Sequence, residues 1–161
     1  MFELSQSFYF EAAHTLRRQV ERNEADGSRR VHGHTYSAEV CVQGEVDPAS
    51  GMVVDLAVLR AAIAAVRDRL DHHFLDEVPG LGVPTLENLC RYIHAQVAAA
   101  VPDVASVMVE RKSSGDRCVY RPASGDGSVY RPASGDGSVY RPASGDDDGG
   151  DALRLLSGGA A

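Results

Sequence analysis

The chain has 161 residues, of which 43% are hydrophobic, and a formal net charge of −7 at pH 7. This length suffices for one domain with a sizeable core, and the acidic balance disfavours a nucleic-acid partner. No apolar run approaches the roughly 20 residues that a bilayer-spanning helix needs, and the first residues lack the layout of a signal peptide. We therefore expect a cytoplasmic protein with no membrane and no nucleic-acid partner.

The N-terminal third predicts two strands joined by a polar segment. Residues 2–12 alternate between apolar and polar side chains, and residues 32–43 alternate again, as half-buried strands do. Between them, residues 15–31 carry several arginines and carboxylates. We interpret most of these charges as belonging to a solvated loop. Arginines beside a metal could alternatively meet phosphate groups.

The middle of the chain predicts two amphipathic helices and a closing hairpin. Asp55 is a suitable N-cap for a helix that begins at Leu56, and Thr85 for a second helix that ends before Pro102. Met52–Val54 could add a short strand. Residues 104–111 and 118–120 form the predicted hairpin. We therefore predict an α+β domain in which two helices cover one face of a four-stranded antiparallel sheet.

The C-terminal segment has a different character. Val-Tyr-Arg-Pro-Ala-Ser-Gly-Asp begins at Val119, Val129 and Val139, a period of ten residues. Units this short and polar bury too little surface to offset their ordering entropy. We predict a domain over residues 1–122 and a largely disordered ten-residue-repeat tail over residues 123–161. A functional repeat is the minority interpretation.

Three histidines form a candidate metal site. His32 and His34 lie two residues apart and so share one face of their strand, and His14 has the parity of Phe10 and Ala12. If the two strands pair, three imidazoles converge. Three neutral imidazoles with an open fourth position are typical of catalytic zinc, because structural sites are usually closed by four protein ligands.

A second motif, Leu70-Asp71-His72-His73, follows the first predicted helix. An Asp–His pair can place a general acid or base. The alternative is a helix C-terminus at which histidines interact favourably with the helix dipole. The residues alone do not separate these two interpretations.

In order along the chain, five motifs resemble the 6-pyruvoyl-tetrahydropterin synthase family, which includes the 6-carboxy-tetrahydropterin synthase of queuosine biosynthesis. They are Phe-Glu-Ala-Ala-His at 10–14, Val-His-Gly-His at 31–34, Gly-Glu-Val-Asp-Pro at 44–48, Leu-Asp-His-His at 70–73 and Pro-Thr-Leu-Glu-Asn-Leu at 84–89. The resemblance spans residues 2–121. It implies a tunnelling fold, trimers or hexamers with active sites between subunits, and dihydroneopterin triphosphate as substrate.

The same resemblance assigns residues to roles. It implies Zn²⁺ on His14, His32 and His34, and proton relay by Asp71 and His72. We also expect Thr85 and Glu87 to contact substrate, and a late glutamate to anchor the pterin. With zinc as a Lewis acid that lowers the pKa of a bound hydroxyl, proton abstraction leads to loss of triphosphate or to cleavage of the side chain.

Two positions depart from the family pattern. Ser28 stands where the family has a proton-abstracting cysteine, and a hydroxyl is a far weaker acid than a thiol. Three explanations compete: His72 activates Ser28, a carboxylate of the polar loop (Glu21, Glu24 or Asp26) acts as the base instead, or the usual reaction is lost or changed. In the third strand Glu110 stands one position early and Arg111 occupies the expected position of the anchoring glutamate. We retain Glu110 as the predicted anchor.

The leading functional hypothesis is therefore a zinc-dependent lyase acting on 7,8-dihydroneopterin triphosphate, with Ser28 in place of the usual cysteine. The competing hypothesis is a non-catalytic or altered-specificity pterin-binding homologue, including a variant that forms 6-hydroxymethyl-dihydropterin.

Overall fold

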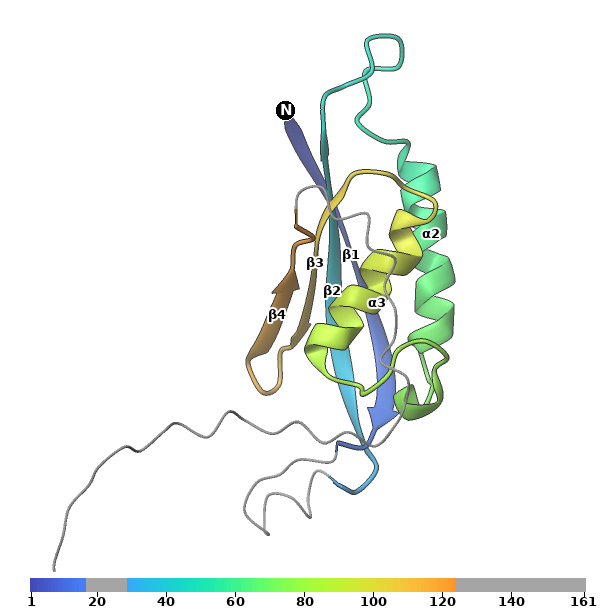
Figure 1. Cartoon of the computed structure of the whole chain (residues 1–161), viewed down its shortest axis with the longest axis vertical. Helices are drawn as coiled ribbons and strands as arrows, with labels where there is room; N and C mark the ends of the chain where they lie inside the picture. The colour runs from blue at the N-terminus through green and yellow to red at the C-terminus, as the bar shows by residue number, and fades with distance from the viewer. Residues whose placement is uncertain (17–28, 124–161) are drawn as a thin grey trace, which may run out of the picture.

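A four-stranded antiparallel sheet organises the molecule, and its strand order follows the chain. The computed structural model describes residues 1–16 and 29–123. Strands β1 (Phe2–His14), β2 (His32–Gly44), β3 (Val104–Arg111) and β4 (Asp116–Tyr120) lie in the order β1-β2-β3-β4. Both helices lie on the same face of this sheet (Figure 1). The predicted fold class is thereby confirmed. Ser28, the carboxylates Glu21, Glu24 and Asp26, and residues 124–161 of the ten-residue-repeat tail lie outside the described residues.

The two long strands pair along their whole length, as their alternation predicts. The register runs from Phe2 opposite Gly44 to His14 opposite His32. The short strand predicted at Met52–Val54 is wrong. The backbone N–H of Asp47 donates to the carbonyl of Met52 at 2.9 Å, so this segment closes a tight loop on itself.

Both helices begin at the predicted caps. Helix α2 spans Leu56–Leu70, and the Asp55 side chain accepts a hydrogen bond from the N–H of Ala57. Helix α3 spans Leu86–Ala98, and the Thr85 side chain accepts from the N–H of Asn88. A short 3₁₀ helix, η1 (Leu75–Glu77), connects them. These caps satisfy backbone donors that a helix start otherwise leaves without partners.

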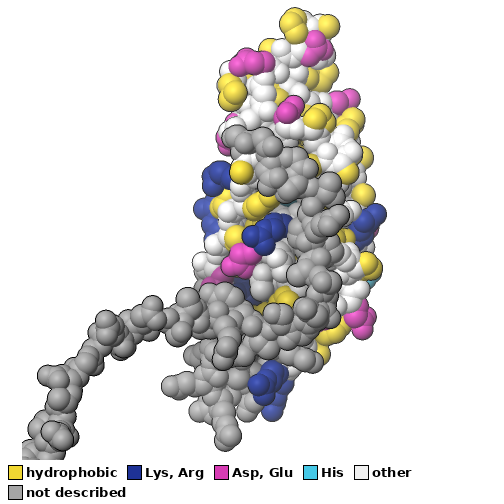
Figure 2. Space-filling model, in the orientation of Figure 1, with side chains coloured by type: hydrophobic (Ala, Val, Ile, Leu, Met, Phe, Trp, Pro, Cys, Tyr) yellow, Lys and Arg dark blue, Asp and Glu magenta, His cyan; other side chains and the backbone are white. Residues whose placement is uncertain are grey.

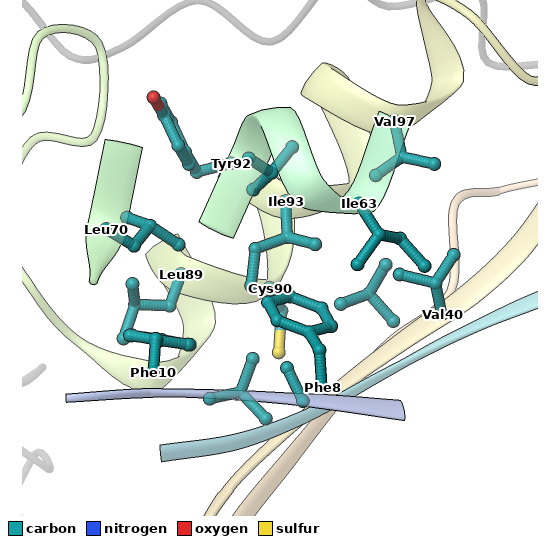
Figure 3. Close-up of a cluster of buried hydrophobic side chains, with 14 of the residues drawn as sticks. Phe8, Phe10, Val40, Ile63, Leu70, Leu89, Cys90, Tyr92, Ile93 and Val97 are labelled. Carbon is teal, nitrogen blue, oxygen red and sulfur yellow. The ribbon is translucent and has the colours of Figure 1, made fainter. Parts of the chain in front are cut away.

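The core lies between the helices and the covered face of the sheet (Figure 3). Phe10 is 1% exposed and stacks on Tyr36 with ring centroids 4.8 Å apart. Cys90 projects its sulfur from α3 toward the strands (Figure 3), and burial raises the pKa of its thiol. The side chains that fill this layer include Phe8, Val40, Leu59, Ile63, Leu70, Leu89, Ile93 and Val97.

One end of the sheet gathers the segments that carry the predicted chemistry. The end of β1, the start of β2, the start of α3 and the β3–β4 hairpin all lie there (Figure 1). The opposite end carries the β2–α2 connection, where acidic side chains recur on the face shown in Figure 2. Among the described helices, none combines the length and apolar character that crossing a bilayer requires.

Candidate metal centre

The pairing of β1 with β2 brings three histidines together. His14 lies directly opposite His32, and His34 lies opposite Ala12, two residues before His14. The ring centroids are 4.5 Å apart for His14 and His32, 5.1 Å for His14 and His34, and 4.9 Å for His32 and His34. One ligand atom from each histidine lies within 4.8 Å of the others. The strand parity predicted from the sequence therefore produces a compact cluster of imidazoles.

His14 has the character of a metal ligand. Its side chain is 2% exposed, and neither ring nitrogen has a hydrogen-bond partner in the described part of the chain. Buried polar atoms are normally satisfied, so these orphaned nitrogens indicate a missing partner. Burial, followed by repulsion from the neighbouring histidines, lowers the pKa of His14 to about 4. The imidazole is therefore neutral at pH 7, the form that binds metal.

The other two histidines are oriented by neighbours. The Nδ1–H of His32 donates to the carbonyl of Arg30 at 2.9 Å, which leaves Nε2 as the nitrogen available to a metal. The Nε2 of His34 lies 3.2 Å from Nη1 of Arg111. Burial, and then the Arg111 charge, lower the pKa of His34. The donor set of three imidazoles fits Zn²⁺.

A hollow of about 570 Å³ opens beside the histidines. Thr85 and Glu87, the two residues expected to contact substrate, line it from the start of α3. Side chains from all four strands complete this histidine hollow; its described lining is His14, Leu16, His32, Tyr36, Pro84, Thr85, Leu86, Glu87, Arg111, Asp116, Arg117 and Cys118. Its size suits a small organic molecule.

The structure does not bring Glu110 to this hollow within one chain. Glu110 lies opposite Ser37, on the sheet face away from the histidines, and its carboxylate is 3.7 Å from Nζ of Lys112. Arg111 lines the hollow instead. The one-position slip noted in the sequence thus turns the carboxylate away. Arg111 is a site residue that we assigned no role from sequence, although it shares the parity of the buried Val107 and Val109.

His72 lines a second hollow of about 730 Å³, and Asp71 lies directly beside it in the chain. The Nδ1 of His72 lies 3.2 Å from the Asp71 carboxylate, and its Nε2 lies 3.9 Å from that of Glu11. Because a carboxylate only accepts, Nδ1 carries the proton of neutral His72 and Nε2 keeps its lone pair. This relay hollow is lined by Glu11, Ala12, Ala13, Val31, Gly33, His34, Thr35, His72, His73 and Phe74.

Asp71 is held in its ionised form. The N–H of Glu11 donates to Oδ1 of Asp71 at 2.8 Å, and Nη2 of Arg67 donates to Oδ2 at 3.2 Å. The bond from Glu11, followed by His72 and Arg67, lowers the pKa of this carboxyl. The backbone of His72 has a φ of 60°, an uncommon conformation for a residue with a side chain. The structure thus brings Asp71 and His72 into contact, and the acid–base interpretation of this pair stays a prediction.

The comparisons with known proteins agree with this geometry. Residues 3–123 match the family model described as 6-pyruvoyl tetrahydropterin synthase. The chain is 36% identical to the 6-carboxy-5,6,7,8-tetrahydropterin synthase of a Synechocystis strain, over 68% of this chain and 85% of that protein. It is 33% identical to the dihydroneopterin monophosphate aldolase of Pyrococcus furiosus, over 58% of this chain and 72% of that protein.

Solved structures agree as well. The Caenorhabditis elegans 6-pyruvoyl tetrahydropterin synthase superposes with a TM-score of 0.65 at 29% identity, covering 76% of this chain and 96% of the other. The named relatives are enzymes of pterin metabolism, and the fold is the tunnelling fold that the sequence implied. The chain therefore belongs to the 6-pyruvoyl tetrahydropterin synthase family.

Proposed function

We propose that the protein is a zinc-dependent lyase acting on 7,8-dihydroneopterin triphosphate to form a 6-carboxy- or 6-pyruvoyl-tetrahydropterin product. The observation that carries this proposal is His14, a buried imidazole with two unpartnered nitrogens beside His32 and His34. Zinc bound there would supply a Lewis acid that lowers the pKa of a substrate hydroxyl. His14, His32 and His34 would hold it, and Thr85 and Glu87 would contact the substrate in the same hollow.

His72 is the proposed proton carrier. Its Nε2 lone pair accepts a proton while Nδ1–H stays bonded to Asp71, and the ionised carboxylate stabilises the imidazolium that forms. Asp71 positions the ring and fixes its tautomer. Positioned acid–base groups of this kind contribute roughly 10²–10⁴-fold in rate. His72→Ala should therefore abolish measurable turnover while leaving the three histidine ligands untouched.

The active site is proposed to be completed between copies of the chain in a homotrimer or homohexamer. Within one chain His14 and His32 line the histidine hollow, whereas His72, which contacts Asp71, lines the relay hollow. A second copy that presents its relay hollow to the histidine hollow would unite metal and base. Glu110, which lies on the other sheet face, would then reach a ligand only across such an interface.

Ser28 bears on which reaction follows. Without a thiolate at this position, the first proton passes to His72, to Ser28 activated by His72, or to a carboxylate among Glu21, Glu24 and Asp26. Product analysis with dihydroneopterin triphosphate, comparing the wild type with Ser28→Cys, distinguishes these cases. A gain of at least tenfold in Ser28→Cys would mean that the site is intact except for its base.

A second candidate function is supported by the similarity to the Pyrococcus furiosus aldolase and by the absence of the cysteine. In this alternative the protein cleaves the side chain to give 6-hydroxymethyl-dihydropterin, or binds a pterin without turnover. The same product analysis separates the alternatives. Formation of a 6-hydroxymethyl product would contradict the leading proposal and support side-chain cleavage. Binding of sepiapterin with no consumption of dihydroneopterin triphosphate would contradict the leading proposal and support a pterin-binding protein without turnover.

The metal requirement is tested separately. Freshly purified protein should contain about one zinc per chain by mass spectrometry, and chelation should remove both the zinc and the turnover. His94→Gln is a matched control, because that histidine bonds the carbonyl of Val104 at 3.1 Å and lines neither hollow. Protein without bound zinc or any other divalent metal would contradict the proposal.

A further inference from the structure

We propose that Arg111 binds an oxyanion, a carboxylate or phosphate group, of the ligand that occupies the histidine hollow. This inference rests on the proposed metal site and adds a chemical requirement for the ligand. The first observation is the position of Arg111 in the fold. Arg111 is the last residue of β3 and lines the hollow together with His14 and His32. Its side chain is 22% exposed, so the guanidinium lies at the wall of the hollow and not in bulk solvent.

The contact between Arg111 and His34 is incompatible with a metal on the same nitrogen. A guanidinium has only donors, so Nη1 of Arg111 donates to the lone pair of His34 Nε2 at 3.2 Å. A metal bound through Nε2 would use that same lone pair. When the metal binds there, Nη1 loses its acceptor and needs another one.

Arg111 is held in place without His34. Its Nη2 donates to Oδ2 of Asp116 at 2.6 Å, and the hydroxyl of Ser114 donates to the same oxygen at 2.6 Å. The Nε atom is buried and has no partner among the described residues. Once a metal takes the lone pair of His34 Nε2, the side chain stays anchored through Nη2 and has donors without acceptors at Nε and Nη1. Such an arginine is prepared to receive an acceptor group.

At the position where the family pattern has a carboxylate, the wall of the hollow carries a hydrogen-bond donor in place of an acceptor. A glutamate at this position would accept hydrogen bonds from a ligand's amino and ring N–H groups, whereas Arg111 can only donate. Asp116 neutralises one positive charge, and Glu87 is the other carboxylate of the lining. With a divalent cation on the histidines, the hollow keeps an excess of positive charge near Arg111. An anionic acceptor therefore fits this wall better than the amino edge of a pterin.

The test measures anion binding to the full chain loaded with Co²⁺, which reports its ligands through visible absorption. The first titration measures Co²⁺ stoichiometry, and the second adds inorganic phosphate or acetate to the loaded protein. In the wild type, either anion should change the cobalt spectrum or bind by calorimetry. Arg111→Gln should weaken that binding at least tenfold, the loss expected for a hydrogen bond to a charged group. Tighter binding of phosphate indicates a phosphate group, and comparable binding of acetate a carboxylate.

Controls make each outcome decisive. Arg91→Gln removes the same charge from the exposed face of α3, lines neither hollow, and should leave anion affinity within twofold. If Arg111→Gln fails to fold, Arg111→Lys takes its place in the test. This variant keeps the charge but loses the planar fork of donors, and it should weaken anion binding several-fold. Full cobalt loading with unchanged anion affinity in Arg111→Gln would overturn this inference alone. Absence of any cobalt binding in the wild type would overturn the metal site as well.

Discussion

The histidine hollow and the relay hollow lie at the same end of the sheet, yet they are built on opposite physical principles. In the first, His14 is 2% exposed and its ring nitrogens have no hydrogen-bond partner among the described residues. In the second, the His72 side chain is 76% exposed and has carboxylates on both sides. Burial keeps the imidazole of His14 neutral, whereas the imidazole of His72 lies in solvent between two carboxylates. The two environments match the two roles proposed above, metal ligand for His14 and proton carrier for His72.

The largest expected effect comes from His14. His14→Asn should lower zinc affinity by about two orders of magnitude or more, since zinc binding to four ligands amounts to about 10–16 kcal/mol. Competition with a chromophoric chelator measures the change, and His94→Gln should bind zinc as the wild type does. If the relay hollow depends on the metal site for its structure, the Asp71–His72 pair would also be disturbed, and the contrast between the hollows would fail.

The reciprocal change is Asp71→Asn. It should lower kcat about tenfold to a hundredfold by removing the charge that stabilises protonated His72, and it should leave the zinc content at the wild-type value. An unchanged kcat, or loss of zinc from this variant, would contradict the division of roles.

The pH dependence of the stability of metal-free protein tests the buried environment of His14. His14 has a pKa of about 4 in the fold and 6.5 as its ordinary value. Below pH 6.5 the unfolded chain gains a proton that the folded chain does not, so stability falls as pH decreases toward 4. The free energy of unfolding should drop by about 2–3 kcal/mol over this window from His14. Urea denaturation at a series of pH values measures it, and His14→Asn should lose this component.

The smallest expected effect separates folding from binding at the start of α3. Thr85→Ala and Asp55→Ala each remove a helix cap and should each lower the free energy of unfolding by about 1 kcal/mol. Because only Thr85 lines the histidine hollow, only Thr85→Ala should raise the KM for dihydroneopterin triphosphate. Equal kinetic effects of the two variants would remove Thr85 from the site.

Strand parity explains how much of this site follows from sequence. On paired strands, parity alone brings His14 to the face of His32 and His34, and the caps at Asp55 and Thr85 are local signals. The separation of the two hollows is not local, because it depends on how the segment after α2 packs on β1. No spacing rule contains that information.

Glu110 was predicted to anchor the ligand, but Arg111 lines the histidine hollow. The family pattern favoured the carboxylate, whereas the burial parity of Val107 and Val109 pointed to the arginine. The structure follows the parity, since one residue along a strand reverses the face. The prediction of a short strand at Met52–Val54 failed for another reason. The β-branched residues there have no neighbouring strand among the described residues with which to pair.

The backbone of His72 carries a further consequence. Its φ of 60° is one that glycine adopts without steric cost, and a residue with a Cβ pays for it, on the order of 1 kcal/mol. The conformation is imposed by β1, since the His72 N–H donates to the carbonyl of Glu11. A chain selected only for thermal endurance would accept glycine at this position. Under the proposed role of His72 as proton carrier, the imidazole costs folding stability and supplies reactivity, so His72→Gly should raise the free energy of unfolding and abolish turnover.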